Sequence, residues 1–412
     1  MTRPGTSFDL LVLEPAERGH GLEWLRHLAA YARHGRRRPR LAFVVSRSIA
    51  DRLRACCPTT HGSRVIALSP REARFCTHRS LIVSGLARWW VMRRYLRAVG
   101  ARQGLFLEFD HLSLPLALGL SFGASRTVAG ILFRPSVHYP ATGKATCAER
   151  LRDCRKSLLY RLLLRRRAVR RVHVLDDAFP AYAATHYDGG GKVSYLPDPA
   201  HPATCSNWRD RHLAASLPPD RMLFLLFGVL DERKGVLILL QALSRLDPAT
   251  AARMAVILAG SADDSIRSAL HDRASDVERR VPSLWLHVED RVLRDGEIDA
   301  LVARADVVLA PYQRFVGSSG VLMWAASRGR PVIAQDYGLL GRLVRQHRLG
   351  LTVDTTDPAA LAKALATAVA RGSFGLANPR DLARFAAGHR AGDFAAAILD
   401  PVLDSMPRTA TA

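Results

Sequence analysis

PYQRFVGSSGVLMWAASRGRPVIA, residues 311–334, carries the strongest pattern in this chain. An apolar strand predicted at 307–310 leads into the small-residue turn 317–320, and an amphipathic helix and a second apolar strand follow. Glycine and serine let main-chain N–H groups approach a ligand closely, and the helix that begins here directs the positive end of its dipole toward that ligand. The turn therefore suits a phosphate group. The ordinary alternative is a strand-turn-helix connection in which a serine caps the helix.

A second segment of the same kind lies upstream, at residues 222–243, and reads MLFLLFGVLDERKGVLILLQAL. An apolar strand ends at Gly228, a short loop runs to Lys234 and Gly235, and apolar residues then recur at helical spacing. Because open α/β sheets bind ligands beyond the carboxyl ends of their strands, the ammonium group of Lys234 is placed to reach a phosphate. The alternative is a solvated charge cluster at 231–234, which is common at helix starts.

These segments, in this order and at this separation, resemble one half of the retaining glycosyltransferases of family four, the glycosyl transferases group 1, which have the GT-B fold. In that family a strand ends in Gly, a loop closes with Lys-Gly, and a Gly-rich turn and helix precede G-x-P-V-I-A, matched here by GRPVIA at 329–334. VILAG at 256–260, with Ser261, resembles the family's central strand and its ligand-facing end. The resemblance covers residues 220–390.

The resemblance implies an α/β protein with the GT-B fold, in which two Rossmann-like α/β/α domains face each other across a cleft. It implies a nucleoside-diphosphate sugar as the donor substrate, with no separate cofactor. The residues expected to bind that donor are Gly228, Arg233, Lys234, Gly260, Ser261, Gly317, Ser318, Ser319 and Gly320.

The chain departs from the family pattern at three positions. The family has two glutamates eight residues apart, and Val316 and Trp324 stand in their places; Val229 replaces an arginine that follows the strand-ending glycine. Loss of a carboxylate that accepts ribose hydroxyl hydrogen bonds removes about 1.5–3 kcal/mol, so the ribose must be held differently or the site is degenerate. Arg233 is the candidate for the missing cation, because its planar fork can bind a diphosphate through two hydrogen bonds.

The length of 412 residues predicts two domains of about 150–200 residues each. We expect an acceptor-side Rossmann-like domain at 1–200, a linker at 201–220 and a nucleotide-sugar-binding Rossmann-like domain at 221–385. Residues 386–412 are expected to form a helix that crosses back to the first domain, followed by a frayed tail.

Strands that alternate with helices also predict a parallel sheet in the first half. The expected strands are at 8–14, 41–45, 64–68, 104–109, 128–133 and 172–175. His20, Asp110 and His138 each follow one of these strands, where the carboxyl ends form one edge of the sheet. They are the candidates for orienting or deprotonating an acceptor hydroxyl. At His20 the alternative is a flexible turn with an incidental histidine.

Positive charge is concentrated in the first half. Residues 1–200 hold 34 Lys and Arg against 14 Asp and Glu, which accounts for +20 of the formal net charge of +23. Arginines gather at 33–40, 88–97 and 152–171, and the last two runs read as basic amphipathic helices. Such helices suit an anionic membrane surface. The alternative is a solvated face rich in arginine; nucleic acid is disfavoured because no nucleic-acid-binding motif accompanies the charge.

Other classes of protein are disfavoured by what the sequence lacks. No apolar run reaches about 18 residues and the N-terminus lacks a signal pattern, so we expect a cytoplasmic protein, peripheral at the inner face of the membrane. Six cysteines without CxxC spacing indicate reduced thiols. No DxD-type motif indicates a metal site, and the pairs 176–177 and 263–264 are interpreted as helix-cap or surface acids.

These observations predict a metal-independent, retaining glycosyltransferase acting on a cell-surface glycan or lipid-linked acceptor in polysaccharide biosynthesis. Its chemistry would depend on Lys234 and the amides of the 317–320 turn, which stabilise negative charge on the leaving phosphate. Two alternatives remain open. One is a degenerate, non-catalytic GT-B protein that binds a glycan or a partner transferase. The other is a nucleotide-sugar epimerase on the same fold.

Overall fold

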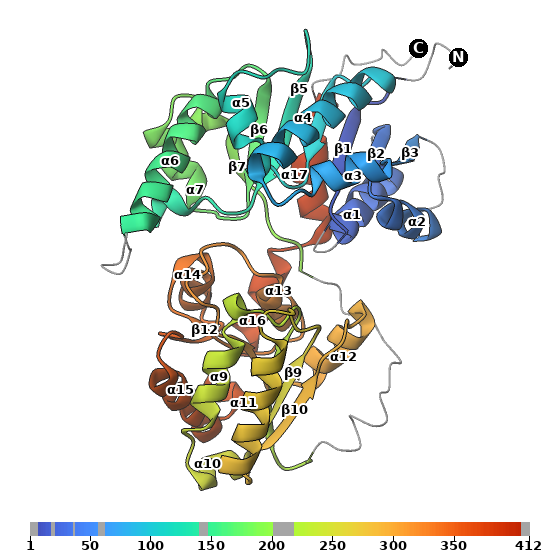
Figure 1. Ribbon diagram of the computed structural model, residues 1–412. Helices are drawn as coiled ribbons and strands as arrows, with labels where there is room; N and C mark the ends of the chain where they lie inside the picture. The colour runs from blue at the N-terminus through green and yellow to red at the C-terminus, as the bar shows by residue number, and fades with distance from the viewer. Residues whose placement is uncertain are drawn as a thin grey trace. The chain divides into compact units, whose positions relative to one another are not determined.

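The computed structural model describes residues 7–17, 21–35, 38–56, 62–139, 147–200 and 218–404 (Figure 1). The chain divides into two compact units. Unit 1 comprises Met1–Pro197 together with Ala391–Ala412, and unit 2 comprises Asp198–Arg390. Most of the predicted linker, at 201–217, lies outside the described residues.

Unit 1 is built on a seven-stranded parallel sheet with the order β3-β2-β1-β4-β5-β6-β7. The strands are β1 (Leu10–Glu14), β2 (Leu41–Val45), β3 (Ser63–Ala67), β4 (Gln103–Phe106), β5 (Thr127–Leu132), β6 (Val169–Val174) and β7 (Val193–Tyr195). The two central strands of the first half, β1 and β2, are buried along their whole length, because helices cover both faces of the sheet.

The helices of unit 1 include one from the far end of the chain. They are α1 (Gly21–His34), α2 (Arg47–Cys56), α3 (Pro70–Cys76), α4 (Leu81–Ala98), α5 (Ser113–Ala117), α6 (Cys147–Leu164), α7 (Phe179–His186) and α17 (Ala391–Asp404), with short 3₁₀ turns at Asp110–Leu112, Ser136–His138 and Gly190–Lys192. Helix α17 packs beside α1: the rings of Phe394 and Trp24 lie 5.1 Å apart, and Tyr31 donates to Asp400 at 2.8 Å.

Unit 2 is built on a six-stranded parallel sheet with the order β10-β9-β8-β11-β12-β13. The strands are β8 (Met222–Phe227), β9 (Met254–Ala259), β10 (Trp285–Glu289), β11 (Val307–Ala310), β12 (Val332–Gln335) and β13 (Gly350–Val353). The helices are α9 (Val236–Leu243), α10 (Pro248–Ala252), α11 (Arg267–Arg280), α12 (Asp295–Arg304), α13 (Gly320–Ser327), α14 (Gly338–His347), α15 (Pro358–Arg371) and α16 (Pro379–Ala387), with 3₁₀ turns at Glu232–Lys234 and Ser373–Gly375.

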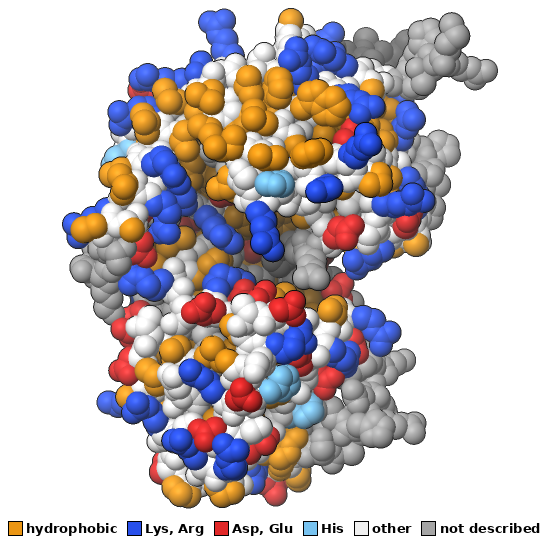
Figure 2. Space-filling model, viewed as in Figure 1, with side chains coloured by type: hydrophobic (Ala, Val, Ile, Leu, Met, Phe, Trp, Pro, Cys, Tyr) orange, Lys and Arg blue, Asp and Glu red, His pale blue; other side chains and the backbone are white. Residues whose placement is uncertain are grey.

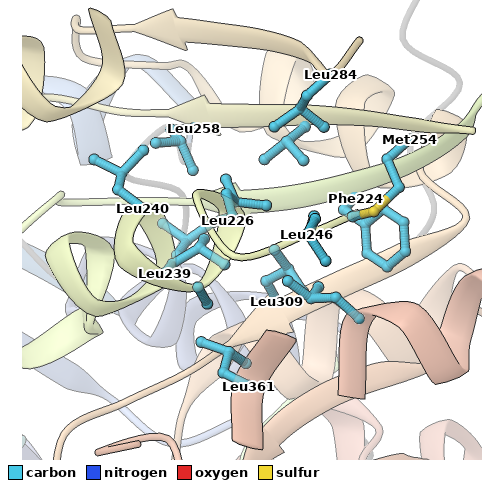
Figure 3. Packing of buried hydrophobic residues seen from close by; sticks show 14 of the residues in the cluster. Phe224, Leu226, Leu239, Leu240, Leu246, Met254, Leu258, Leu284, Leu309 and Leu361 are labelled. Carbon is cyan, nitrogen blue, oxygen red and sulfur yellow. The ribbon is translucent and has the colours of Figure 1, made fainter. Parts of the chain in front are cut away.

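The core of unit 2 explains why its sequence folds this way. Leu239 and Leu240 of α9 meet Leu226 of β8 and Leu258 of β9, and Leu361 of α15 closes the cluster (Figure 3). Helix α9 begins directly after the loop that follows β8, so burial of its apolar face fixes that loop against the end of the sheet.

In each sheet the order of the strands reverses at one point. In unit 1 successive strands are added from β1 toward β3 on one side and from β4 toward β7 on the other; in unit 2 the reversal lies between β8 and β11. Loops that leave neighbouring strands on opposite sides leave a crevice at such a point, where open α/β sheets bind ligands. The topology therefore marks one candidate site at the carboxyl edge of each sheet.

The predicted α/β fold with two parallel, Rossmann-like sheets is confirmed. Two local expectations are wrong. The basic run 152–171 is not one helix, because α6 ends at Leu164 and the β-branched residues beyond it enter β6. The strand predicted at 104–109 ends at Phe106, and a 3₁₀ turn begins at Asp110.

None of the helices among the described residues has both the length and the hydropathy that crossing a bilayer requires.

Candidate active site

The carboxyl end of β8 in unit 2 holds a buried lysine. Lys234 is 7% exposed, and its ammonium group donates to the carbonyl oxygen of Phe227, the last residue of the strand. A Cβ atom on Gly228 would lie 2.7 Å from that ammonium nitrogen, so a glycine there leaves room for the lysine. Asp231 fixes the loop, because its carboxylate accepts the main-chain N–H of Lys234 at 2.9 Å.

Two further glycines bring the ends of neighbouring strands together. A Cβ atom on Gly260, which follows β9, would lie 2.0 Å from the carbonyl oxygen of Gly228. A Cβ atom on Gly235 would lie 2.0 Å from the carbonyl oxygen of Pro311, which follows β11. Both glycines have positive φ, 143° and 71°. Their contacts require glycine, and they hold the loops after β8, β9 and β11 in one place. Ser261 contributes its carbonyl oxygen, which accepts from Leu230 at 3.0 Å.

A tyrosine connects this lysine to the small-residue turn. The ring of Tyr312 lies 5.8 Å from the ammonium nitrogen of Lys234, and its hydroxyl is 2.8 Å from the hydroxyl of Ser319. Ser319 caps α13, since its side chain accepts the N–H of Val321 at 3.3 Å. Lys234, Tyr312 and Ser319 therefore form a continuous row of contacts from the end of β8 to the start of α13, which begins at Gly320.

Arg233 places a second positive charge on the same aromatic residues. Its guanidinium lies 5.4 Å from the ring of Tyr312 and 5.1 Å from that of Phe315. Asp231 pairs with it at 3.2 Å. The side chain is 40% exposed, so a ligand can still reach its free N–H groups.

Ser318 and Gly317 of the predicted phosphate turn differ in their surroundings. Ser318 already donates its hydroxyl to the buried carboxylate of Asp198, at 2.8 Å. Gly317, one residue earlier, is buried. The Asp198 contact joins the first residue of unit 2 to this turn, and the sequence offers no local pattern that reveals it.

The positions that differ from the family pattern are apolar in the structure as well. Trp324 is buried in α13, whereas Val229 is 47% exposed at the end of β8. The main-chain carbonyl of Val316 accepts the N–H of Leu339 at 3.2 Å, which ties the turn to the start of α14. No carboxylate replaces the missing pair at these positions.

The carboxyl edge of unit 1 carries acids in place of a lysine. Glu14 ends β1 and is 5% exposed; burial raises its pKa to about 7, although the N–H of Ala16 donates to it at 2.8 Å. Glu108 follows the adjacent β4. Burial alone would raise the pKa of Glu108, but His111 and the guanidinium of Arg88 outweigh it and lower that pKa to about 2.

Arg88 is the centre of this acidic group. It reaches across from α4, is 3% exposed, and contacts Glu108 at 2.8 Å and the carbonyl oxygen of Cys76 at 2.9 Å. His111 lies 3.5 Å from the other oxygen of Glu108 and 2.6 Å from the hydroxyl of Ser84. Sequence reasoning did not identify Glu14, Arg88 or Glu108 as site residues. For Glu14 the sequence did offer a signal, because an acidic residue ends an apolar strand there.

Asp110 joins two strands of unit 1. Its carboxylate accepts the N–H of Phe133, just beyond β5, at 2.9 Å, and burial raises its pKa. Lys156 of α6 lies close enough to oppose that rise, and its ammonium group donates to the carbonyl oxygen of Arg134 at 3.1 Å. The predicted candidate is therefore a buried carboxyl group at the expected edge of the sheet, with one oxygen engaged by main chain.

His138 forms a buried pair with an aspartate. Its Nε2 atom lies 2.9 Å from a carboxylate oxygen of Asp176, and the hydroxyl of Tyr139 donates to the same oxygen. The Nδ1 atom of His138 is buried and has no hydrogen-bond partner among the residues that the structure describes, which leave out 140–146. Asp176 was interpreted as a helix-cap or surface acid, and at 1% exposure it is not a surface acid. It lies between β6 and α7, where one carboxylate oxygen accepts the N–H of Ala178 just before α7, at 3.0 Å, and the other receives the histidine. His20 lies outside the described residues.

Comparison with known proteins gives a family for unit 2. Residues 221–371 match the family described as Glycosyl transferases group 1. No curated protein sequence matches the chain.

Solved structures share the fold of the whole chain. An Anabaena protein, HepE, solved in complex with UDP, is 16% identical, with a TM-score of 0.65 over 96% of this chain and 100% of that chain. The sucrose-phosphate synthase of Thermosynechococcus elongatus is 16% identical, with a TM-score of 0.69 over 96% and 98%. A UDP-forming α,α-trehalose-phosphate synthase of Burkholderia vietnamiensis is 15% identical, with a TM-score of 0.71 over 97% and 99%. At these identities the likeness shows the fold. The family match thus places a glycosyl transferases group 1 domain within unit 2, at residues 221–371, and the solved structures show that the chain as a whole has the GT-B fold.

Proposed function

We propose that the protein transfers a sugar from a nucleoside-diphosphate sugar to a glycan or lipid-linked acceptor, with retention of anomeric configuration and without a metal ion. The observation that carries this proposal is the row Lys234–Tyr312–Ser319 at the reversal point of the unit 2 sheet. One related structure holds UDP and another holds UDP and glucose, which supports a donor of this class.

The leaving diphosphate is the group that this site would stabilise. As the glycosidic bond breaks, negative charge grows on the β-phosphate, and Lys234 with the amides of the 317–320 turn would bind that charge more strongly than the ground state. An ammonium group has three N–H donors. Lys234 can therefore keep its bond to Phe227 and still donate to a phosphate oxygen. The planar guanidinium of Arg233 would take the second position on the diphosphate.

The acceptor hydroxyl would be handled by unit 1. His20, Asp110 and His138 remain our candidates for orienting or deprotonating it. Of these, His138 has the geometry of a proton acceptor, because Asp176 engages Nε2 while Nδ1 carries no hydrogen bond within the described part of the chain. A carboxylate so placed holds the ring in one orientation and stabilises the imidazolium that forms when the ring takes a proton.

We further infer that the protein works at the cytoplasmic face of a membrane and contributes to a cell-envelope polysaccharide. The support is the positive charge of the first 200 residues, which suits an anionic lipid surface or a lipid-linked acceptor.

A donor screen tests the proposed function. Thermal unfolding of the full chain is measured with UDP, GDP and ADP and with their glucose and mannose conjugates. We expect one base to raise the Tm in proportion to its concentration, as binding to the folded state requires. If no nucleotide shifts the Tm, the non-catalytic alternative is favoured. If the shifting donor is consumed to an isomeric nucleotide sugar without any acceptor, the protein is an epimerase.

A further inference from the structure

Exposed apolar side chains gather on one face of unit 1. Ile82, Leu86 and Trp90 of α4 are 55%, 43% and 50% exposed, and their spacing of four residues places them in one row along the helix. Phe75 at the end of α3 and Leu81 at the start of α4 extend the row. Figure 2 shows apolar side chains clustered over this part of unit 1, with Lys and Arg around them. We call these five residues the α3–α4 surface.

The α3–α4 surface is presented by firmly held helices. A capping box fixes the start of α3, in which Ser69 and Glu72 exchange hydrogen bonds of 3.0 and 3.3 Å with each other's main chain. The opposite face of α4 is buried. A Cβ atom on Gly85 would lie 2.3 Å from the carbonyl oxygen of His111, and Arg88 is 3% exposed. The apolar row is therefore an outward face of a packed helix.

The segment that carries the α3–α4 surface, residues 70–98, is almost entirely positive in charge. Between residues 70 and 98 the only acid is Glu72, which is buried and paired with Arg94 at 2.7 Å. The guanidinium of Arg94 also lies 5.4 Å from the ring of Trp90. The exposed or half-exposed arginines of this segment are Arg71, Arg74, Arg79, Arg93, Arg94 and Arg97.

We propose that the α3–α4 surface docks on an anionic lipid bilayer, with its apolar row at the boundary between headgroups and acyl chains and its arginines on the headgroups. Arginine can keep its charge in the headgroup layer while its stem covers apolar surface, and tryptophan is favoured at this depth. A second copy of the chain is a poorer occupant, because a two-fold contact would bring the same arginines face to face. The proposal deepens the inferred membrane partner by naming the surface that meets it, and it does not depend on sugar transfer.

Vesicle binding by the full chain tests this proposal. Co-sedimentation is measured with vesicles of phosphatidylcholine alone and with vesicles of equal parts phosphatidylglycerol and phosphatidylcholine. We expect binding to the anionic vesicles, weakened by added salt. The double variant Leu86→Glu, Trp90→Glu should bind at least about tenfold more weakly, because two apolar contacts are lost and two negative charges face the lipid.

Phe374→Glu provides the matched control, since Phe374 is 84% exposed in unit 2. This variant should bind vesicles as the unchanged protein does. Circular dichroism and the Tm show whether the double variant is folded; if it is not, the single variant Ile82→Ser replaces it and should weaken binding in the same direction. The proposal is overturned if the folded variant binds as the unchanged protein does, if neutral vesicles bind equally well, or if nothing binds. It is also overturned if Leu86→Glu instead dissociates a dimer or a complex with an acidic protein.

Discussion

The two sheets share a topology and differ in the chemistry at their reversal points. Between β8 and β11, unit 2 gathers glycines, a buried lysine and the amide-rich start of a helix. Between β1 and β4, unit 1 gathers Glu14, Glu108 and a buried Arg88 that neutralises one of them. Strand order thus marks the candidate site of each sheet, whereas the residues that end the strands set which class of ligand that site would suit. A phosphate suits the first site, and a hydroxyl-rich or cationic group suits the second.

The largest expected effect on this difference between the two sites comes from removing the ammonium group of Lys234 from unit 2. Lys234→Ala should lower turnover by about 100- to 1000-fold, the range found when one preorganised donor to a developing charge is lost. Arg233→Ala should weaken nucleotide binding by a smaller factor, since Arg233 is half-exposed and shares its charge with Asp231. Lys363→Ala is the matched control, because Lys363 is exposed on α15. Initial rates and nucleotide affinity are measured for all three.

The outcomes separate the two cations. Unchanged nucleotide affinity in Arg233→Ala, beside its loss in Lys234→Ala, would show that Arg233 does not replace the missing family arginine. Unchanged rates in Lys234→Ala would remove the proposed diphosphate site.

The next effect concerns the close approach of strands that makes the unit 2 site. Gly260→Ala should destabilise the fold by about 3 kcal/mol, because the new methyl group meets main chain and the positive φ disfavours a side chain. Gly392→Ala is the control: Gly392 lies in α17 with open space around it, so alanine should be neutral or stabilising by up to about 1 kcal/mol. Urea unfolding measures both. An unfolding midpoint in Gly260→Ala equal to that of the unchanged protein would mean that the two loops do not need this contact.

The sequence was a better guide to unit 2 than to unit 1 for a physical reason. Lys234, Gly228 and Gly260 lie within or beside strands whose loops are short, so local spacing already places them at one edge. Tyr312 was not identified, although it follows the predicted strand by two residues, because only the packed structure shows that its hydroxyl reaches Ser319.

Arg88 shows what sequence spacing could not resolve in unit 1. It lies in a run of arginines that reads as an outward basic face, yet it points inward. Its direction is set by Gly85, which lets α4 approach the turn after β4, and by Glu108 beyond that strand. Contacts between segments far apart in the chain decided these positions.

Burial of Glu14 in unit 1 should make the free energy of unfolding depend on pH. Its pKa is raised by burial from 4.5 to about 7, so folding favours the protonated form. The unfolded chain ionises first, so the contribution of Glu14 to the free energy of unfolding should fall from about pH 4.5 to about pH 7 and then remain level. Glu14→Gln should flatten this part of the profile and be more stable than the unchanged protein at pH 8, by about 3 kcal/mol at most.

The free energy of unfolding in urea, measured from pH 4 to pH 8, checks this expectation. Glu17 is three residues along the chain and exposed, so Glu17→Gln is its control. In the folded protein the pKa of Glu108, lowered to about 2, keeps that group ionised throughout this range. The unfolded chain binds a proton there near pH 4.5, so Glu108 adds a rise in stability between about pH 4 and pH 5.5 that both proteins share and that cancels in their comparison. A profile in Glu14→Gln parallel to that of the unchanged protein would show that Glu14 is not the buried acid that sets the slope.

The smallest expected effect tests whether the unit 2 site is a connected row or a lone lysine. Tyr312→Phe keeps the ring that faces Lys234 and Arg233 and removes only the hydroxyl bonded to Ser319. One neutral hydrogen bond contributes about 0.5–1.5 kcal/mol, so nucleotide affinity should fall by a few-fold while the fold survives. The main-chain carbonyl of Tyr312 still accepts from Thr355 at 2.6 Å, which holds the loop in place. Tyr195→Phe, on an exposed tyrosine of unit 1, should leave affinity unchanged. Equal nucleotide affinity in both variants would mean that Ser319 is positioned by α13 alone, and that the lysine acts without help from the tyrosine hydroxyl.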